Sequence, residues 1–173
     1  KLVDVALEKR SPVSLGSAIV GAELLPNHEP VVLLEGSSEL AIAKRIQQGQ
    51  KLTNARAGTA AIHTWHIPEV FGTTTASERE VLDSVLRWRR QYRRRSFGDA
   101  DPVSSYFLRK HFGNAVLEGL VEKGYLRKIG HYHDLADTYN GKFRRAMESE
   151  PSYTVDTRFG DPRLFLHPSE HRG

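Results

Sequence analysis

Apolar residues recur at intervals of three and four along residues 77–95, so this stretch is the clearest helix that the sequence predicts. Ser77 and Glu80 match the S-x-x-E capping box and mark the expected start of the helix. At a rise of about 1.5 Å per residue, the helix would be about 28 Å long. Its apolar face would be formed by Val81, Val85, Trp88 and Tyr92. The opposite, solvent-facing side would carry Arg87, Arg90 and Arg94.

Two shorter helices and a pair of strands follow in the pattern. Asp101 has the side chain of an N-cap for a helix that ends at Gly113, and residues 114–123 carry the apolar stripe of a third helix. The inward face of the second helix would be formed by Val103, Tyr106, Phe107 and Phe112. Residues 125–129 alternate as a strand, and residues 131–135 return beside it. Three helices followed by a β-hairpin predict a winged-helix-like core, a variant of the helix-turn-helix.

The two flanking regions differ in character. Before the core, we expect an irregular segment with helices over residues 11–27 and 37–49, and a short strand over residues 62–65. After it we expect a small β-strand region, with a hairpin at Asn140-Gly141 and strands over residues 152–157 and 163–167. The predicted fold class is therefore α+β. The predicted divisions are an N-terminal helical and loop segment (1–75), a winged-helix-like subdomain (76–136) and a β-rich tail (137–173).

Charge adds a functional hint to this pattern. The 173 residues include 25 Lys and Arg against 21 Asp and Glu, and six of the basic residues fall within residues 87–95. A sequence pI near 9.4 with clustered arginine is typical of nucleic-acid binding proteins. No apolar run is long enough for a membrane-spanning helix, so no membrane partner is expected.

Candidate catalytic and metal chemistry is sparse. The chain has no cysteine, which excludes disulfides, cysteine-ligated zinc and thiol catalysis, and which fits a cytoplasmic protein. Histidines occur in pairs at residues 63 and 66 and at residues 131 and 133, but neither pair has a third potential ligand at a spacing typical of a zinc site. No glycine-rich phosphate loop or nucleophile motif is present, so we predict no metal site and no catalytic residue.

The third helix is poorly suited to reading bases. It would expose Glu118 and Glu122, which repel phosphates, so we do not expect it to lie in the major groove as a standard recognition helix. The basic candidates for DNA contact outside the first helix are Arg127, Lys128, Lys142, Arg144 and Arg145. For Arg144 and Arg145 the alternative is a structural salt bridge to Glu148 or Glu150.

Three runs in the tail resemble a known family in order and spacing. Residues 142–145 read KFRR, residues 151–155 read PSYTV, and residues 167–172 read HPSEHR. They resemble the end of the target-recognition region of DNA cytosine-5 methyltransferases. Residues 14–29 and 37–52 resemble the family's segments after its central catalytic motifs, so the likeness covers roughly residues 11–173.

The resemblance implies a recognition region separated from its catalytic machinery. Enzymes of this family flip a cytosine out of duplex DNA and transfer a methyl group from S-adenosyl-methionine to C5, using a cysteine thiolate that this chain lacks. The implied partners are double-stranded DNA and the catalytic domain of the parent enzyme. No cofactor is expected in this chain, and the protein would be a monomer associated with the bacterial nucleoid. The resemblance also places Thr154 among the residues that position DNA.

Two other functions remain open at this point. The helical core could be a protein-interaction module whose arginine helix binds an acidic partner, a reading that the acidic third helix favours. Alternatively, the chain could be a stand-alone winged-helix DNA-binding regulator, which would be a dimer on a palindromic site.

Overall fold

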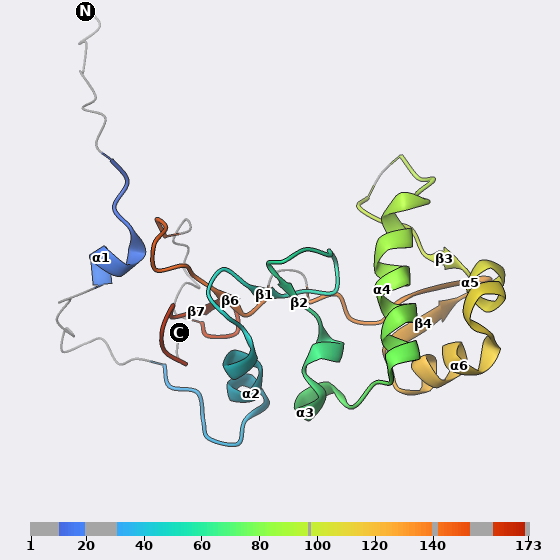
Figure 1. The fold of residues 1–173 in the computed structure, drawn as a ribbon, viewed down its shortest axis with the longest axis horizontal. Helices are drawn as coiled ribbons and strands as arrows, with labels where there is room; N and C mark the ends of the chain where they lie inside the picture. The colour runs from blue at the N-terminus through green and yellow to red at the C-terminus, as the bar shows by residue number, and fades with distance from the viewer. Residues whose placement is uncertain (1–10, 20–30, 97, 140–141, 153–160, 172–173) are drawn as a thin grey trace, which may run out of the picture.

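The computed structural model describes residues 11–19, 31–96, 98–139, 142–152 and 161–171. The fold is α+β, with short helices and three small sheets. The described elements form two groups at opposite ends of an elongated molecule, joined near the start of the longest helix (Figure 1). We call the group built on that helix the three-helix unit and the other group the two-ended unit, since it takes residues from both ends of the chain.

The three-helix unit combines three helices with a three-stranded antiparallel sheet. In chain order its elements are α4 (Ala76–Gln91), β3 (Val103–Ser104), α5 (Ser105–Phe112), α6 (Asn114–Glu122), β4 (Leu126–Ile129) and β5 (Tyr132–Leu135). The strand order is β3-β5-β4, so the short strand before α5 pairs with the returning arm of the hairpin. The third helix and both arms of the hairpin lie where the sequence predicts them. The assignment to the winged-helix class remains a prediction.

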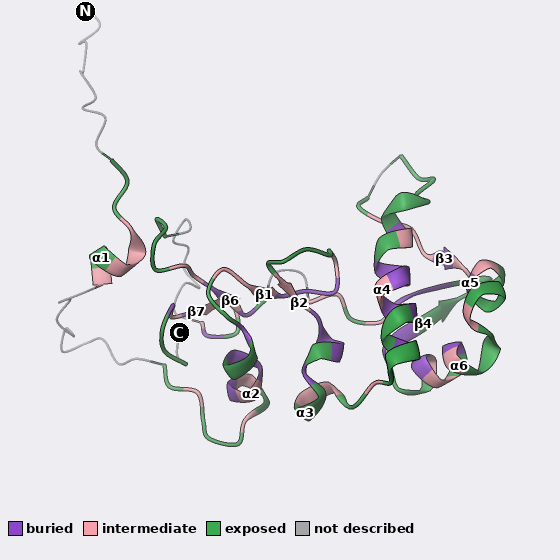
Figure 2. Cartoon of the chain, in the orientation of Figure 1, coloured by how far each residue is buried: buried purple, intermediate pink, exposed green. Residues whose placement is uncertain are grey.

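One hydrophobic core holds the three-helix unit together. Its fully enclosed side chains come from all three helices and from the hairpin, and include Val81, Leu82, Leu108, Leu120 and Leu135. Figure 2 shows α4 buried along one side and exposed along the other, as its apolar periodicity requires. Gly113 has φ +82°, a conformation that glycine tolerates, and it separates α5 from α6 without a longer loop.

The start of α4 differs from the prediction. The capping box is formed by Thr75 and Glu78: the Thr75 hydroxyl accepts from the Glu78 N–H at 3.2 Å, and the Glu78 carboxylate accepts from the Thr75 N–H at 2.8 Å. The predicted box at Ser77 and Glu80 is therefore wrong. Glu78 is also held by Lys123 at the end of α6, with Nζ to Oε1 at 2.7 Å, and this tertiary contact selects the earlier box.

The end of α4 and the start of α5 also differ. The helix ends at Gln91, so Arg94 lies in the following loop and not on the helix face. Asp101 does not cap α5, because residues 103–104 form β3 before that helix starts. Its carboxylate instead accepts from the backbone N–H groups of Arg94 and Arg95, at 2.7 and 3.0 Å. Tyr106, predicted to face inward, is 75% exposed.

The two-ended unit is built from the regions on either side of the three-helix unit. Its elements are α1 (Leu15–Ile19), α2 (Ser38–Arg45), β1 (Lys51–Leu52), β2 (Ala61–Ile62), a 3-10 helix (Thr64–His66), α3 (Pro68–Phe71), β6 (Arg144–Arg145) and β7 (Phe165–Leu166). The pairs β1–β2 and β6–β7 are both parallel. A second core joins Ile42, Ile46 and Ile67 to Phe143 and Leu166. Residues predicted as separate N- and C-terminal segments therefore share one interior.

The predicted tail strands have mixed outcomes. The strand at residues 163–167 contains β7. The Asn140-Gly141 turn and the strand at residues 152–157 lie outside the described residues. Beside the turn, the Lys142 N–H donates to the Tyr139 carbonyl at 3.4 Å, Lys142 also bridges to Leu52, and Arg144 and Arg145 pair with β7. The expected helix at residues 37–49 is α2, capped by Ser37, whereas of the helix at 11–27 the structure describes only α1.

Candidate nucleic-acid interface

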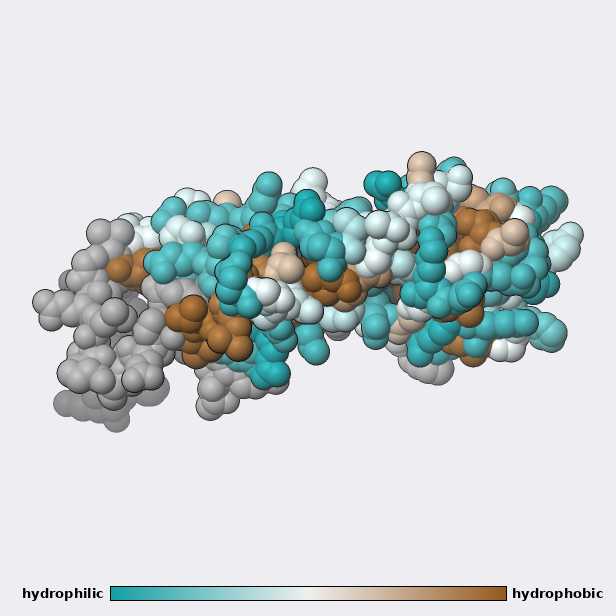
Figure 3. Space-filling model, turned by 90° about the horizontal axis from the view of Figure 1, so that it is seen from below, coloured by the Kyte–Doolittle hydropathy of each residue, from teal (hydrophilic) through white to brown (hydrophobic). Residues whose placement is uncertain are grey.

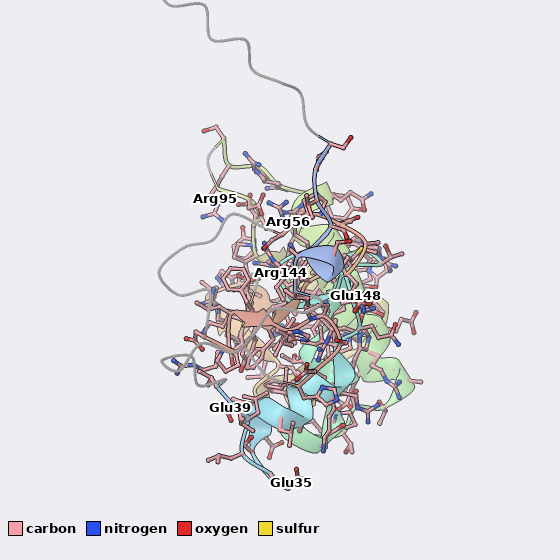
Figure 4. The ribbon with its side chains drawn as sticks, turned by 90° about the vertical axis from the view of Figure 1, so that its left-hand side faces the viewer. Glu35, Glu39, Arg56, Arg95, Arg144 and Glu148 are labelled. Atoms are coloured by element: carbon pink, nitrogen blue, oxygen red, sulfur yellow. The ribbon has the colours of Figure 1, made fainter. Side chains whose placement is uncertain are left out.

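Positive charge gathers where α4 ends. The residues concerned are Arg56, Arg90, Arg93, Arg94 and Arg95, which we call the arginine edge. Two of them share one carboxylate: Asp99 Oδ2 lies 2.5 Å from Arg90 Nη2 and 3.2 Å from Arg56 Nη2. This contact also ties the loop before β2 to the loop after α4. In the view along the molecule, Arg56 and Arg95 lie in the upper part, and Glu35 and Glu39 lie at the bottom (Figure 4).

Asp101 fixes the backbone of this edge. Besides the two N–H groups of Arg94 and Arg95, its carboxylate pairs with the Arg95 guanidinium. These hydrogen bonds, first those from the backbone and then the one from Arg95, lower the pKa of Asp101 to about 2. The Arg93 guanidinium donates to the carbonyls of Arg95 and Ser96, at 2.9 and 3.0 Å. Hydrogen bonds to Asp101 and to backbone carbonyls thus hold residues 93–95, which directly follow α4.

Arg87 is separate from this edge. It is exposed on α4, and its Nη2 donates to the Ser84 hydroxyl at 3.2 Å. It borders a shallow hollow of about 410 Å³ that Arg79, Glu80 and Asp83 also line, so its surroundings are of mixed charge. The predicted line of Arg87, Arg90 and Arg94 along one helix face is therefore wrong in part, since only the first two lie on the helix.

The hairpin carries the next pair of predicted contacts. Arg127 faces Asp134 across the two strands, with Nη2 to Oδ2 at 3.2 Å, and its side chain is 57% exposed. Asp134 also pairs with the buried Arg89 of α4, at 2.5 Å. Reasoning from the sequence missed Arg89, which lies within the same run of arginines but on the buried side of the helix. Lys128 is exposed, on the opposite face of the hairpin from Arg127.

The tail residues separate into different environments. Lys142 is exposed and Arg144 is half-buried, whereas Arg145 is buried with 3% of its surface accessible. Thr154 lies outside the described residues. The prediction that Arg145 contacts DNA is therefore wrong. The alternative of a salt bridge to Glu148 or Glu150 is wrong for Arg145 as well, because its guanidinium binds other acceptors.

All five N–H donors of Arg145 are used inside the protein. Nε and Nη2 donate to the carbonyls of Ile46 and Ala43 at the end of α2, at 2.7 and 2.8 Å. Nη1 donates to the carbonyls of His167 and Glu170, at 2.5 and 2.6 Å, and Nη2 also to His171 Nδ1, at 3.1 Å. Burial lowers the pKa of Arg145. Since helix ends leave their last carbonyls without partners, this arginine completes α2 and fastens the C-terminal segment to it.

The histidine pairs have structural partners. His63 is buried and donates from Nδ1 to the Thr53 carbonyl at 2.6 Å, and burial lowers its pKa. His133 is buried beside Ser105, with Nδ1 2.9 Å from Oγ, whereas His131 is exposed. Over the residues that the structure describes, there is no group of three or more His, Asp or Glu side chains placed to hold a metal ion.

The remaining surface is mostly hydrophilic when seen from below, with apolar patches toward both ends (Figure 3). None of the described helices combines the length and the apolar character needed to cross a bilayer. The chain matches no known protein family in a scan against family models, and it has no significant match among curated proteins or solved structures.

Proposed function

We propose that this chain binds double-stranded DNA as the target-recognition region of a DNA cytosine-5 methyltransferase. The observation that carries the proposal is the arginine edge, where five arginines gather and where, among the described residues, Asp99 pairs with Arg56 and Arg90 and Asp101 pairs with Arg95. A preordered group of arginines suits the regular spacing of duplex phosphates. The likeness of the three tail runs to the methyltransferase family supports the same reading.

In this proposal, catalysis and DNA binding belong to two different parts of one enzyme. The parent's catalytic domain would bind S-adenosyl-methionine and supply the attacking thiolate, and this chain would hold the duplex in register. The exposed acids of α6, Glu118 and Glu122, argue against base reading by that helix. Phosphate contacts by the arginine edge and by Lys128 would supply affinity and orientation.

Salt-dependent binding of duplex DNA tests the proposal. We expect fluorescence anisotropy to give a linear fall in log affinity with log salt concentration, with a slope set by the number of phosphates neutralised. Replacing two exposed members of the arginine edge, in R93Q/R94Q, should reduce that slope by up to about two units.

The matched control is K44Q/R45Q, which removes the same charge from exposed positions on α2 and should leave the slope of the wild type. Duplex affinity that is insensitive to salt, or an equal loss of slope in both variants, would contradict the proposal.

A second candidate function is docking to another protein surface, such as the parent's catalytic domain. It is favoured by a group of aromatic rings that lies between α4 and α5 beside the arginine edge. Trp88 and Phe107 have ring centroids 4.8 Å apart, and Phe107 and His111 have theirs 4.3 Å apart. Tyr92, which is 52% exposed, borders them.

Two results together would favour this function. The first is saturable binding to a protein partner that Y92A abolishes, and the second is the lack of any measurable affinity for duplex DNA. A stable dimer in sedimentation would instead favour a stand-alone regulator.

A further inference from the structure

A pocket of about 360 Å³ opens in the three-helix unit between α5, α6 and the hairpin. Leu117 and Val121 of α6 give it an apolar wall. Arg109 of α5 and Lys128 of β4 line it from two other sides, and the buried His133 of β5 borders it as well. The pocket therefore brings three basic side chains from three elements to one place.

The elements fix how these three groups meet. Ser105 and Arg109 are four residues apart on α5 and so share one helix face. The Ser105 hydroxyl lies 2.9 Å from His133 Nδ1, so this face is turned toward the imidazole. Lys128 and His133 are paired residues in the antiparallel register of β4 and β5, so their side chains leave the sheet on the same face. Because Nδ1 is engaged with Ser105, Nε2 is the ring nitrogen left for a ligand.

Neither cation forms an ion pair within the described part of the chain, although two acids line the same pocket. Arg109 and Lys128 make no ion pair or hydrogen bond with any residue that the structure describes. The acids that border the pocket are Glu118, whose carboxylate accepts from the Asn114 amide at 2.5 Å, and Glu122. The third strand contributes the apolar Val103 opposite His133. Burial lowers the pKa of His133, and the positive charges of Arg109 and Lys128 lower it further.

We propose that Arg109, Lys128 and His133 form a binding site for a phosphate group. A guanidinium, an ammonium and an imidazolium that approach from three sides can each donate a charge-assisted hydrogen bond to a different phosphate oxygen. A phosphate dianion or diester would form ion pairs with Arg109 and Lys128, which form none with the described residues. Its arrival would also favour the protonated imidazole, so binding would take up a proton. The inference rests on the proposed function in one respect: the expected source of the phosphate is the backbone of bound duplex DNA.

The experiment follows the His133 ring by NMR in the full chain, with inorganic phosphate in one arm and a short DNA duplex in the other. In the wild type we expect phosphate to shift the ring signals of His133 and to raise its apparent pKa. Binding should be tighter near pH 6 than near pH 8. R109Q and K128Q should each weaken phosphate binding about tenfold or more, as expected for the loss of one charged hydrogen bond. K110Q removes a charge from the exposed neighbouring position of α5, outside the pocket, and should behave as the wild type.

The two arms separate failure of the site from failure of the proposed function. Shifts at His133 with both ligands, with phosphate competing against the duplex, support the site and identify backbone phosphate as its source. Shifts with phosphate alone support a site for a free phosphate anion, and a duplex that does not bind at all then overturns the DNA proposal only. Ring signals that neither ligand moves, or that move equally in R109Q, K128Q and K110Q, overturn the site even if DNA binds elsewhere.

Discussion

Arg145 shows what a single side chain does in this molecule. It has no carboxylate partner among its described contacts, and its guanidinium instead donates hydrogen bonds to five neutral acceptors. Four of those acceptors are backbone carbonyls that belong to two distant segments, the end of α2 and residues 167–170. Loss of the guanidinium would leave the buried Ile46 carbonyl without this donor and would remove donors from the part-buried carbonyls of His167 and Glu170, and a buried polar group without a partner costs about 1–3 kcal/mol.

We therefore expect R145A to lower the free energy of unfolding by about 3 kcal/mol or more. The measurement is urea denaturation at equilibrium, followed by circular dichroism. K142A is the matched control, because Lys142 is exposed and should change stability by less than about 0.5 kcal/mol. Equal stabilities for the two variants would refute the structural role of Arg145.

Asp101 gives a second residue-scale prediction, on pH. The pKa of its carboxyl is about 2 in the folded protein, below the ordinary 3.8, so the folded state favours the charged form. Its contribution is complete above about pH 4 and is lost as the pH falls through 2. D101N should thus be less stable than the wild type at pH 7, and the difference should shrink between pH 4 and pH 2. A difference that stays constant over that range, in urea denaturation at each pH, would contradict this account.

At the scale of elements, α4 illustrates how a tertiary contact decides a helix end. Two overlapping sequences, TASE and SERE, both fit the capping-box pattern, and local reasoning chose the second. The first forms because Glu78 is buried and also reaches Lys123 of α6, with Oε1 and Oε2 at 2.7 and 2.9 Å from Nζ. The contact spans 45 residues of chain, so no local pattern reveals it.

The two candidate boxes give a direct test. E78A removes both the capping hydrogen bond and the Lys123 contact, and we expect it to destabilise the protein by about 1–2 kcal/mol. E80A changes the exposed residue that the sequence favoured, and should stay within about 0.5 kcal/mol of the wild type. Thermal denaturation of both variants decides between the boxes, and a larger loss in E80A would reverse the assignment.

Elements with strong local signals were predictable, and those that depend on partners were not. The amphipathic stripe of α4, the glycine that ends α5, the third helix and the hairpin all follow from patterns within a few residues. Strand β3 was missed because its two residues pair with β5, some 30 positions later in the sequence. Among the candidate DNA contacts, two adjacent arginines differ in burial, since Arg144 is half-buried and Arg145 is buried. This difference arises from tertiary packing, which the local sequence does not reveal.

The whole molecule consists of two cores with different chain connectivity. The core of the three-helix unit is drawn mainly from the continuous stretch between residues 81 and 135, with Trp65 added from the 3-10 helix. The core of the two-ended unit needs residues 42–67 and residues 143–166 together. One unit is therefore largely local in sequence, and the other depends on contacts across the entire length of the first.

This difference predicts an unequal response to truncation. A chain that ends at residue 141 lacks Phe143, Arg145 and Leu166, so the two-ended unit should lose its order while α4 and α6 keep theirs. Hydrogen exchange measured by mass spectrometry should show α2 exchanging rapidly in the shortened chain, and α4 as protected as in the full chain. Protection of α2 without the tail would show that the two units are not divided as described.

The hydrogen bonds of Arg145 to α2 have a consequence for how the protein is made. They join residues 99 and 102 positions apart, so the loop that they close contains the whole three-helix unit. During vectorial synthesis on the ribosome, α2 emerges long before its partner arginine exists. The three-helix unit can fold first and shorten the distance that the later closure must span, which reduces its entropic cost. Helix α2 would then be among the last elements to reach its native state, although it is translated before the three-helix unit.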